Sequence, residues 1–215
     1  MKNKKGLCFI ITGTMMLLAS LFLVFLNFRQ DRESSENASE ILTELKEAIP
    51  QVVETTEFIE SATYNDIFQE YQEYEESTTV PEEKTIRIDD NYYIGTILIP
   101  SLDVELPIIS EWSYPNLKLS PCRYKGSIAE GNLIIASHNY RSHFGRIQEL
   151  NSGDIIVITD ADGISHNYEV VQSEIIDGYN IESMEFGSDD SWDLTLFTCT
   201  LSGQSRVTVR AIEIK

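Results

Sequence analysis

Basic residues are scarce in this sequence. Its 215 residues include 16 lysines and arginines against 35 aspartates and glutamates, which gives a formal net charge of −19. A nucleic-acid-binding protein needs a basic surface that displaces the counterions of the phosphate backbone. The charge balance therefore argues against a nucleic-acid partner.

Cysteine is also rare, and two common sequence patterns are missing. Only Cys8, Cys122 and Cys199 are present, and an odd set of three does not make a disulfide framework. The sequence contains neither internal repeats nor a glycine-rich phosphate-binding loop. At least one thiol is therefore free, and a free thiol is a candidate nucleophile.

One long apolar run is present, and it lies near the N-terminus. Lys2, Lys4 and Lys5 precede an uncharged segment over residues 7–28, and about 20 apolar residues suffice to cross a bilayer. A cleaved secretory signal is the alternative, but its apolar region normally spans only about 7–15 residues. We therefore predict an uncleaved signal anchor over residues 1–30, in the cell membrane, with a cytoplasmic N-terminus and an extracellular C-terminal domain.

An acidic segment follows over residues 31–85. Its composition is rich in glutamate and typical of a disordered linker. Two stretches have the periodicity of an amphipathic helix. Their apolar faces comprise Ile41, Leu42, Leu45, Ala48 and Ile49 in the first, and Ile67, Phe68, Tyr71 and Tyr74 in the second. One interpretation is a helical appendage that packs on the folded domain; we favour a solvated spacer between domain and membrane.

The remaining residues, 86–215, have the pattern of a β domain. Short apolar or alternating stretches predict strands, and turns or loops separate them. These stretches cover residues 92–99, 104–109 (broken by Pro107), 131–136, 155–159, 168–176, 193–199 and 206–211. Residues 122–126 are expected to be irregular and residues 144–150 to form a short helix. We predict an all-β fold, a single closed barrel of about seven or eight strands with short helices.

Cys199 stands at the end of a predicted strand. A strand end is rigid yet open on one side, which suits a nucleophile. Arg206 opens the next alternating run, so the two side chains can lie side by side, and a neighbouring cation favours the thiolate. For a cysteine considered alone, a small buried core residue is the commoner interpretation.

His138 directly follows the apolar stretch 133–136 and therefore also stands at a strand end. Considered alone, such a histidine is more often structural than catalytic. Together with Cys199 and Arg206, however, it places a thiol, an imidazole and a guanidinium at the rim of the expected barrel. A thiol beside an imidazole is a common arrangement for nucleophilic catalysis.

These segments resemble the sortase family. Residues 195–199 (Thr-Leu-Phe-Thr-Cys), followed by Arg206, are similar to the signature Thr-Leu-x-Thr-Cys with a downstream arginine. Residues 131–138 (Gly-Asn-Leu-Ile-Ile-Ala-Ser-His) are similar to the block Gly-Asn-x-x-Ile-Ala-Gly-His, and residues 144–154 resemble the stretch that follows it. The resemblance extends from about residue 94 to the C-terminus. Ser137 replaces a glycine that is common in the family, which leaves the subclass open.

The resemblance implies a sortase-type barrel and a membrane-anchored cysteine transpeptidase of Gram-positive cells, without cofactor or metal. Such an enzyme cuts an LPxTG-like sorting signal of a secreted protein through a thioacyl intermediate. It then transfers the protein to an amine of a cell-wall precursor. By resemblance Cys199 is the nucleophile, His138 the acid and base, and Arg206 the oxyanion or substrate ligand; Thr198 and Ser137 are candidate substrate-binding residues.

The subclass is predicted from the end of the sequence. The chain stops soon after its last predicted strand, without a second apolar span. This is unlike many pilin-polymerising sortases, so we expect a class B or class D member.

Other candidate residues receive structural interpretations. His143 and His166 are predicted to be surface residues, and Cys122 to be an inert buried thiol. Asp160 and Asp162 look like half of a calcium-binding loop, but no ligand series continues from them. We therefore predict no metal site.

Arg210 is the rival to Arg206, because the two arginines share one face of the last strand. Arg206 is preferred because it lies nearer to the strand start and to the cysteine.

Two other functions stay open. An external cysteine peptidase would hydrolyse peptides rather than transfer them, but papain-like enzymes place the cysteine before the histidine and at the start of a helix. A non-enzymatic tethered barrel would bind wall peptides and would have an unreactive Cys199.

Overall fold

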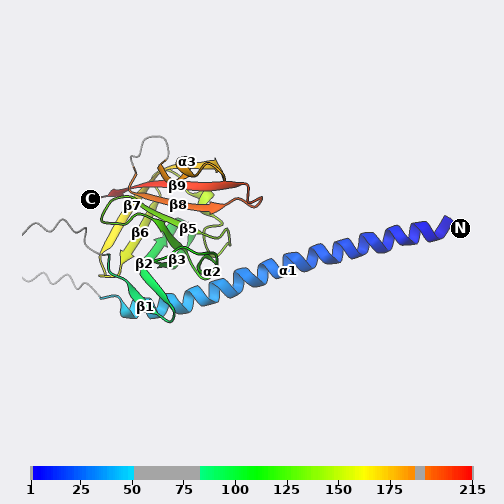
Figure 1. Cartoon of the computed structure of the whole chain (residues 1–215), viewed down its shortest axis with the longest axis horizontal. Coiled ribbons are helices and arrows are strands. Elements are labelled where there is room, and N and C mark those ends of the chain that lie inside the picture. The colour runs from blue at the N-terminus through cyan, green and yellow to red at the C-terminus, as the bar shows by residue number, and fades with distance from the viewer. Residues whose placement is uncertain (1, 51–82, 187–191, 215) are drawn as a thin grey trace, which may run out of the picture.

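The computed structural model describes residues 2–50, 83–186 and 192–214. The second predicted helical stretch, with Ile67, Phe68, Tyr71 and Tyr74, lies outside these ranges. The described part consists of one long N-terminal helix and a β domain against which the end of that helix packs (Figure 1).

Eight strands close into a barrel, which confirms the predicted fold. They are β2 (Asn91–Ile99), β3 (Val104–Ile109), β4 (Cys122–Lys125), β5 (Leu133–Ser137), β6 (Ile155–Asp160), β7 (Ser165–Asp177), β8 (Leu194–Cys199) and β9 (Ser205–Ile214). Their order is β2-β3-β4-β5-β8-β9-β7-β6, and β2 also pairs with β6, which closes the ring. A three-residue strand, β1 (Ile86–Ile88), pairs with the start of β2.

The barrel interior is filled with aliphatic side chains. Fully buried examples come from almost every strand and include Ile94, Ile97, Ile108, Leu133, Ile135, Ile156, Ile158, Leu196 and Val209. Burial of each such side chain contributes roughly 1.5–3 kcal/mol. Apolar packing of these alternating positions is therefore what holds the strands in register.

The central strands β5 and β8 determine where the residues at their carboxyl ends lie. The two strands are parallel, with Leu133 opposite Leu194 and Ser137 opposite Thr198. All residues of β5 are buried, and so are those of β8 except its last, as is typical of parallel strands covered on both faces. Because they are parallel and in register, their carboxyl ends lie side by side at one end of the barrel.

Two local predictions are wrong. Residues 122–126, expected to be irregular, begin with strand β4, because Cys122 and Arg123 pair with Ala136 and Ile135 of β5. Strand β3 continues through Pro107, opposite Thr96. On its other side β3 pairs with β4 only at Ile109. The missing N–H of Pro107 therefore interrupts no backbone hydrogen bonds between β3 and β4.

In the described part of the chain, the connections contain four short helical segments. They are η1 (Pro100–Leu102), α2 (Tyr114–Leu117), η2 (Ile147–Glu149) and α3 (Ile181–Phe186). The helix predicted over residues 144–150 is reduced to the single turn of η2. Backbone bonds from Phe144 to His138 (3.2 Å) and from Gly145 to Tyr140 (2.8 Å) hold the preceding loop in turns instead.

The helix α1 (Lys2–Ala48) does not end at the apolar run. Its N-terminal part projects away from the barrel, and its C-terminal part lies beside β1 and β3 (Figure 1). Ala38 and Leu45 are 1% and 0% exposed, and Lys46 Nζ lies 2.6 Å from Glu105 Oε1 on β3. The favoured interpretation of this segment as a solvated spacer is wrong for residues 31–49, because their apolar face is buried on the barrel.

By length and apolar composition, the early part of α1 qualifies as a membrane span, the one such helix among the described residues. Its apolar side chains, from Leu7 to Phe28, are exposed. An apolar helix surface of this length is costly in water and favourable in a bilayer.

Candidate active site

Cys199, His138 and Arg206 are brought to the same end of the barrel. Cys199 is the last residue of β8, His138 directly follows β5, and Arg206 is the second residue of β9. The antiparallel pairing of β8 with β9 puts Cys199 and Arg206 directly opposite each other. All three side chains line one cavity of about 300 Å³.

The walls of this cavity, called the Cys199 cavity below, are largely apolar. One wall is aromatic and contains Trp112, Tyr114, Tyr124 and Phe197; the other is formed by Asp177, Gly178 and Asn180 after β7 and by Ile181 and Met184 of α3. The Tyr124 and Phe197 rings meet edge to face, with centroids 5.3 Å apart. An apolar cavity with a few polar groups at one end is typical of sites that bind small molecules or peptides.

His138 is half-buried at the edge of the cavity. Burial lowers the pKa of its imidazole below the ordinary value, and the positive charge of Lys118 lowers it further. The Tyr140 ring lies against it, with centroids 4.9 Å apart. At neutral pH the imidazole is therefore mostly uncharged and able to accept a proton.

Arg206 is held by the turn between β8 and β9. Its Nη1 donates to the carbonyl oxygens of Gly203 (3.1 Å) and Ser205 (3.2 Å). Within the described part of the chain, Nε and Nη2 make no hydrogen bond, so these donors are available to a bound molecule.

Gly178 is a residue of this site that sequence reasoning missed. A Cβ at this position would lie 2.6 Å from the Gln204 carbonyl oxygen and 3.0 Å from Arg206 Nη1. Glycine thus permits the close approach of the β7 end to the arginine. The only signal in the sequence is an isolated glycine after a predicted strand.

Arg210, the rival arginine, lies elsewhere. It lies four residues beyond Arg206 on β9, which corresponds to about 13 Å along the strand. Its side chain is fully buried. Its Nη1 donates to Thr195 Oγ1 (2.8 Å) and its Nη2 to the Ser183 carbonyl (2.6 Å). Its guanidinium carbon lies 5.0 Å from the centre of the Trp192 ring. Arg210 therefore fastens α3 to the barrel, which is consistent with the preference for Arg206.

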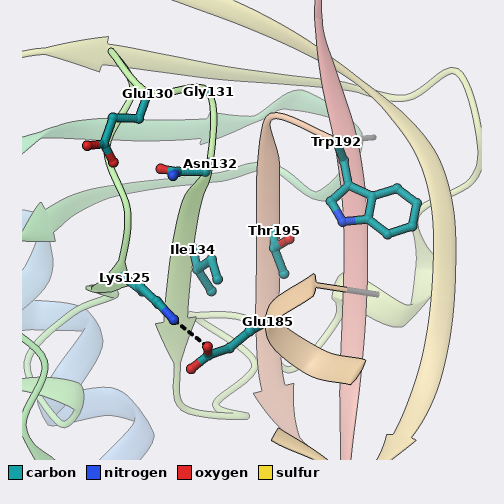
Figure 2. A pocket seen from close by; sticks show the side chains of 8 residues that line it. All are labelled: Lys125, Glu130, Gly131, Asn132, Ile134, Glu185, Trp192 and Thr195. Atoms are coloured by element: carbon teal, nitrogen blue, oxygen red, sulfur yellow. Dashed lines mark hydrogen bonds and ion pairs between the residues drawn. The ribbon is translucent and has the colours of Figure 1, made fainter. Parts of the chain in front are cut away.

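A second pocket, of about 310 Å³, is lined by residues of β4, β5, β8 and α3 (Figure 2). Thr195 and Trp192 line it, and Lys125 of β4 and Glu185 of α3 point toward each other across it, with Nζ 2.5 Å from Oε2. Because α3 also lines the Cys199 cavity, this ion pair ties the wall of that cavity to β4.

Ser137 and Thr198, the predicted substrate-binding residues, are buried. Thr198 Oγ1 donates to the Ser137 carbonyl oxygen (2.8 Å), a bond that links β5 to β8 directly beneath the candidate catalytic residues. Ser137 lines the Cys199 cavity, and its Oγ has no hydrogen-bond partner among the described residues. Thr198 lines a different cavity, on the other side of Cys199.

His143 is not a surface residue, contrary to the prediction. Its side chain is fully buried, and Nε2 lies 3.1 Å from Ser34 Oγ of α1. Burial, together with the charge of a protonated His138, lowers its pKa to about 4, and Asp31 acts in the opposite direction. The contact spans 109 positions, so no local pattern could have revealed it.

His166 is also less exposed than predicted. Its Nδ1 lies 2.9 Å from Glu213 Oε1 and its Nε2 3.3 Å from Asp160 Oδ2. The other oxygen of Asp160 accepts the backbone N–H groups of Asp162 and Ile164, at 2.9 Å each. The Asp160 carboxylate, which looked like a calcium ligand in the sequence, therefore stabilises a turn. Within residues 2–50, 83–186 and 192–214, no group of three or more His, Cys, Asp or Glu residues is placed to hold a metal.

Cys122 has the environment of an inert thiol. It is buried, its Sγ lies 3.4 Å from the Ser120 carbonyl oxygen, and burial raises its pKa to about 12. Of the three cysteines, only Cys199 lies at the cavity described above.

A thiol, an imidazole and a guanidinium at one end of a closed barrel have the chemistry that nucleophilic acyl transfer requires. The sortase domain family matches residues 97–214 of this sequence. The chain belongs to the sortase family. No curated protein sequence matches it.

Solved structures with the same fold include several sortases. Sortase A from Corynebacterium diphtheriae is 24% identical, with a TM-score of 0.52 over 59% of this chain and 62% of that one. Sortase C from Streptococcus pneumoniae is 22% identical, with a TM-score of 0.50 over 57% of this chain and 69% of that one. The chain thus spans less than two thirds of the length of the first. Identities at this level establish the fold, and the expected class B or D assignment stays a prediction.

Proposed function

We propose that this protein is a membrane-anchored cysteine transpeptidase that joins secreted proteins to a cell-wall amine. The observation that carries the proposal is the convergence of Cys199, His138 and Arg206 on one cavity at the carboxyl ends of β5 and β8. Membership of the sortase family supports it. In this proposal residues 86–215 are the catalytic domain, and the enzyme is of class B or D.

Acylation begins with transfer of the Cys199 thiol proton to His138. The thiolate sulfur attacks the carbonyl carbon at the scissile bond of an LPxTG-like sorting signal, and a tetrahedral oxyanion forms. The free donors of Arg206 stabilise the developing negative charge. The C–N bond then breaks, the imidazolium of His138 gives its proton to the leaving amine, and a thioacyl enzyme remains.

Deacylation reverses the roles. His138, again neutral, takes a proton from the incoming amine as the amine nitrogen attacks the thioester carbon. The C–S bond breaks, the new amide leaves, and the proton returns to the sulfur of Cys199. The lowered pKa of His138 favours this base role at neutral pH.

The apolar cavity wall would receive the sorting signal. Trp112, Tyr114 and Tyr124 offer aromatic surface to an apolar side chain, while Ser137, whose hydroxyl is buried, lies at the floor. The exposed apolar part of α1 would anchor the protein, with the N-terminus cytoplasmic and the barrel outside the cell.

The test uses the full chain in detergent micelles with a library of sorting-signal peptides, with and without an added amine. We expect a thioacyl adduct by intact-protein mass spectrometry and an amine-linked product. Cys199→Ala should give neither, whereas Cys8→Ala, a matched change in the apolar part of α1, should give both. Adduct and product in Cys199→Ala would remove Cys199 as the nucleophile.

The same experiment separates the alternatives. A peptidase would release the same hydrolysed product with or without the amine. A non-enzymatic binding barrel would retain peptides without any adduct at Cys199.

A further inference from the structure

The end of the anchor helix reaches the loop that carries His138. This loop, residues 138–146 after β5, contacts α1 at two points. Asp31 Oδ1 accepts bonds from Ser142 Oγ (2.5 Å) and from the Ser142 backbone N–H (3.3 Å). One helical turn later, Ser34 is 3% exposed and bonded to His143. α1 thus contributes polar groups to the surroundings of the candidate active site.

The hydrogen bonds of Ser34 determine which ring nitrogen of His143 carries a proton. The Ser34 hydroxyl donates to the Lys118 carbonyl oxygen at 2.5 Å, which uses its single proton. The bond between Ser34 Oγ and His143 Nε2, 3.1 Å, must therefore have the imidazole as donor. Because burial lowers the pKa of His143 to about 4, the ring is neutral at pH 7 with its proton on Nε2, and its buried Nδ1 has no partner among the described residues.

Tyr140 connects His143 to His138. Its ring centroid lies 5.6 Å from that of His143 and 4.9 Å from that of His138. The loop backbone is rigid, because the Tyr140 carbonyl accepts the N–H groups of His143 (3.0 Å) and Gly145 (2.8 Å). A Cβ on Gly145 would lie only 2.5 Å from the Asn139 carbonyl oxygen. A shift of the His143 ring is therefore transmitted to the ring that packs on His138.

We propose that Ser34 of α1, acting through His143 and Tyr140, is a positioning residue that fixes the orientation of the His138 imidazole. This inference rests on the proposed function, in which His138 transfers the proton. Ser34 lies six residues beyond Phe28, the end of the apolar run, or about 9 Å along the helix. The active site is then complete only when the segment leaving the membrane is docked on the barrel.

The charged and titratable groups that face the two histidines come from several elements. Asp31 lies on α1, Lys118 at the end of α2, and Tyr140 on the loop itself. Cys199 and Arg206 share the cavity with His138. Loss of the Ser34 bond changes none of these charges. It lets the Tyr140 ring move and water reach His138, so the pKa of His138 should rise toward its ordinary value.

The test compares variants of the full chain in detergent micelles. Ser34→Ala should lower kcat about 10-fold, since small misplacements of a catalytic group are costly, and should change KM less than about two-fold. His143→Gln, whose amide can still donate to Ser34, should keep more activity than His143→Phe. Ser34→Ala combined with His143→Phe should be no worse than His143→Phe alone. Ser39→Ala, an exposed serine of the same helix, is the matched control and should behave as wild type.

A readout independent of turnover is the titration of the His138 ring by NMR. We expect Ser34→Ala to raise the pKa of His138 while the folded spectrum is retained. An unchanged titration, even with lower activity or thermal stability, would reduce Ser34 to a structural residue and overturn the inference. Absence of transpeptidation in wild type would count against the proposed function alone, because the titration still tests the contact between Ser34 and His143.

Discussion

Cys199 and Arg206 are direct partners across the antiparallel strands β8 and β9. The turn between them supplies the carbonyl groups that hold the guanidinium, and Gly178 leaves room for it. The thiol and the cation are therefore fixed by one hairpin. The imidazole reaches them through the parallel pairing of β5 with β8.

The two arginines of β9 should respond differently to substitution. Arg206→Ala should lower kcat/KM by about 10²–10³ and change the free energy of unfolding by less than about 1 kcal/mol. Arg210→Ala should cost about 2–4 kcal/mol of stability, because the Ser183 carbonyl and Thr195 lose a buried donor. Denaturant unfolding and peptide turnover measure both quantities. The reverse pattern would make Arg210 the catalytic arginine.

Lys118 should set part of the pKa of His138. Replacing it with methionine removes a positive charge that disfavours the imidazolium, so the pKa of His138 should rise in Lys118→Met. NMR titration of the ring measures the shift. Lys46→Met, an equal change of charge at a residue paired with Glu105, should leave the titration as in wild type. Equal shifts in both variants would indicate a general charge effect instead.

His143 should make stability depend on pH. Its pKa of about 4 in the folded protein lies below the ordinary value of 6.5, so the unfolded chain binds more protons between these values. The free energy of unfolding should therefore fall as pH drops through this window, by about 2–3 kcal/mol at pH 4.5 from this residue. Denaturant unfolding at pH 7 and 4.5 should show a smaller loss in His143→Phe than in wild type. Parallel losses in the two proteins would contradict this assignment.

The Lys125–Glu185 ion pair should affect substrate binding more than chemistry. Glu185→Gln weakens the tie between α3 and β4, so the wall formed by Ile181 and Met184 becomes looser. We expect KM for the peptide to rise about 3–10-fold with kcat nearly unchanged. Asp162→Asn, which weakens a comparable pair with Lys84 at a distant turn, is the matched control. A fall in kcat alone would place the role of the pair in the chemical step.

Local sequence patterns were sufficient for most of the strands, although not for β4, and for placing the three candidate catalytic residues at or next to strand ends. The alternation at residues 194–199 ends where β8 ends, and the apolar run at 133–136 ends one residue before the end of β5. Strand ends depend on such local patterns, because an alternating apolar face must be buried against one side of a sheet.

Contacts between distant segments were not predictable in this way. The polarity of His143 suggested exposure, yet Ser34 and Tyr140 surround it. Acidic composition suggested a solvated spacer, yet Ala38 and Leu45 are buried. In each case the side chain is buried by residues that lie tens of positions away in the sequence. No local pattern in a single sequence reveals such a contact.

The sequence by itself determined the apolar N-terminal segment, the strand-rich domain and the positions of Cys199, His138 and Arg206 at or next to strand ends. Local periodicity and chain length are enough for these. Only the tertiary structure decided that Arg206 rather than Arg210 faces the thiol, that α3 is clamped by Lys125 and Glu185, and that α1 reaches the histidine loop through Ser34. Those choices depend on which faces the closed barrel buries and which distant side chains it leaves within hydrogen-bonding distance.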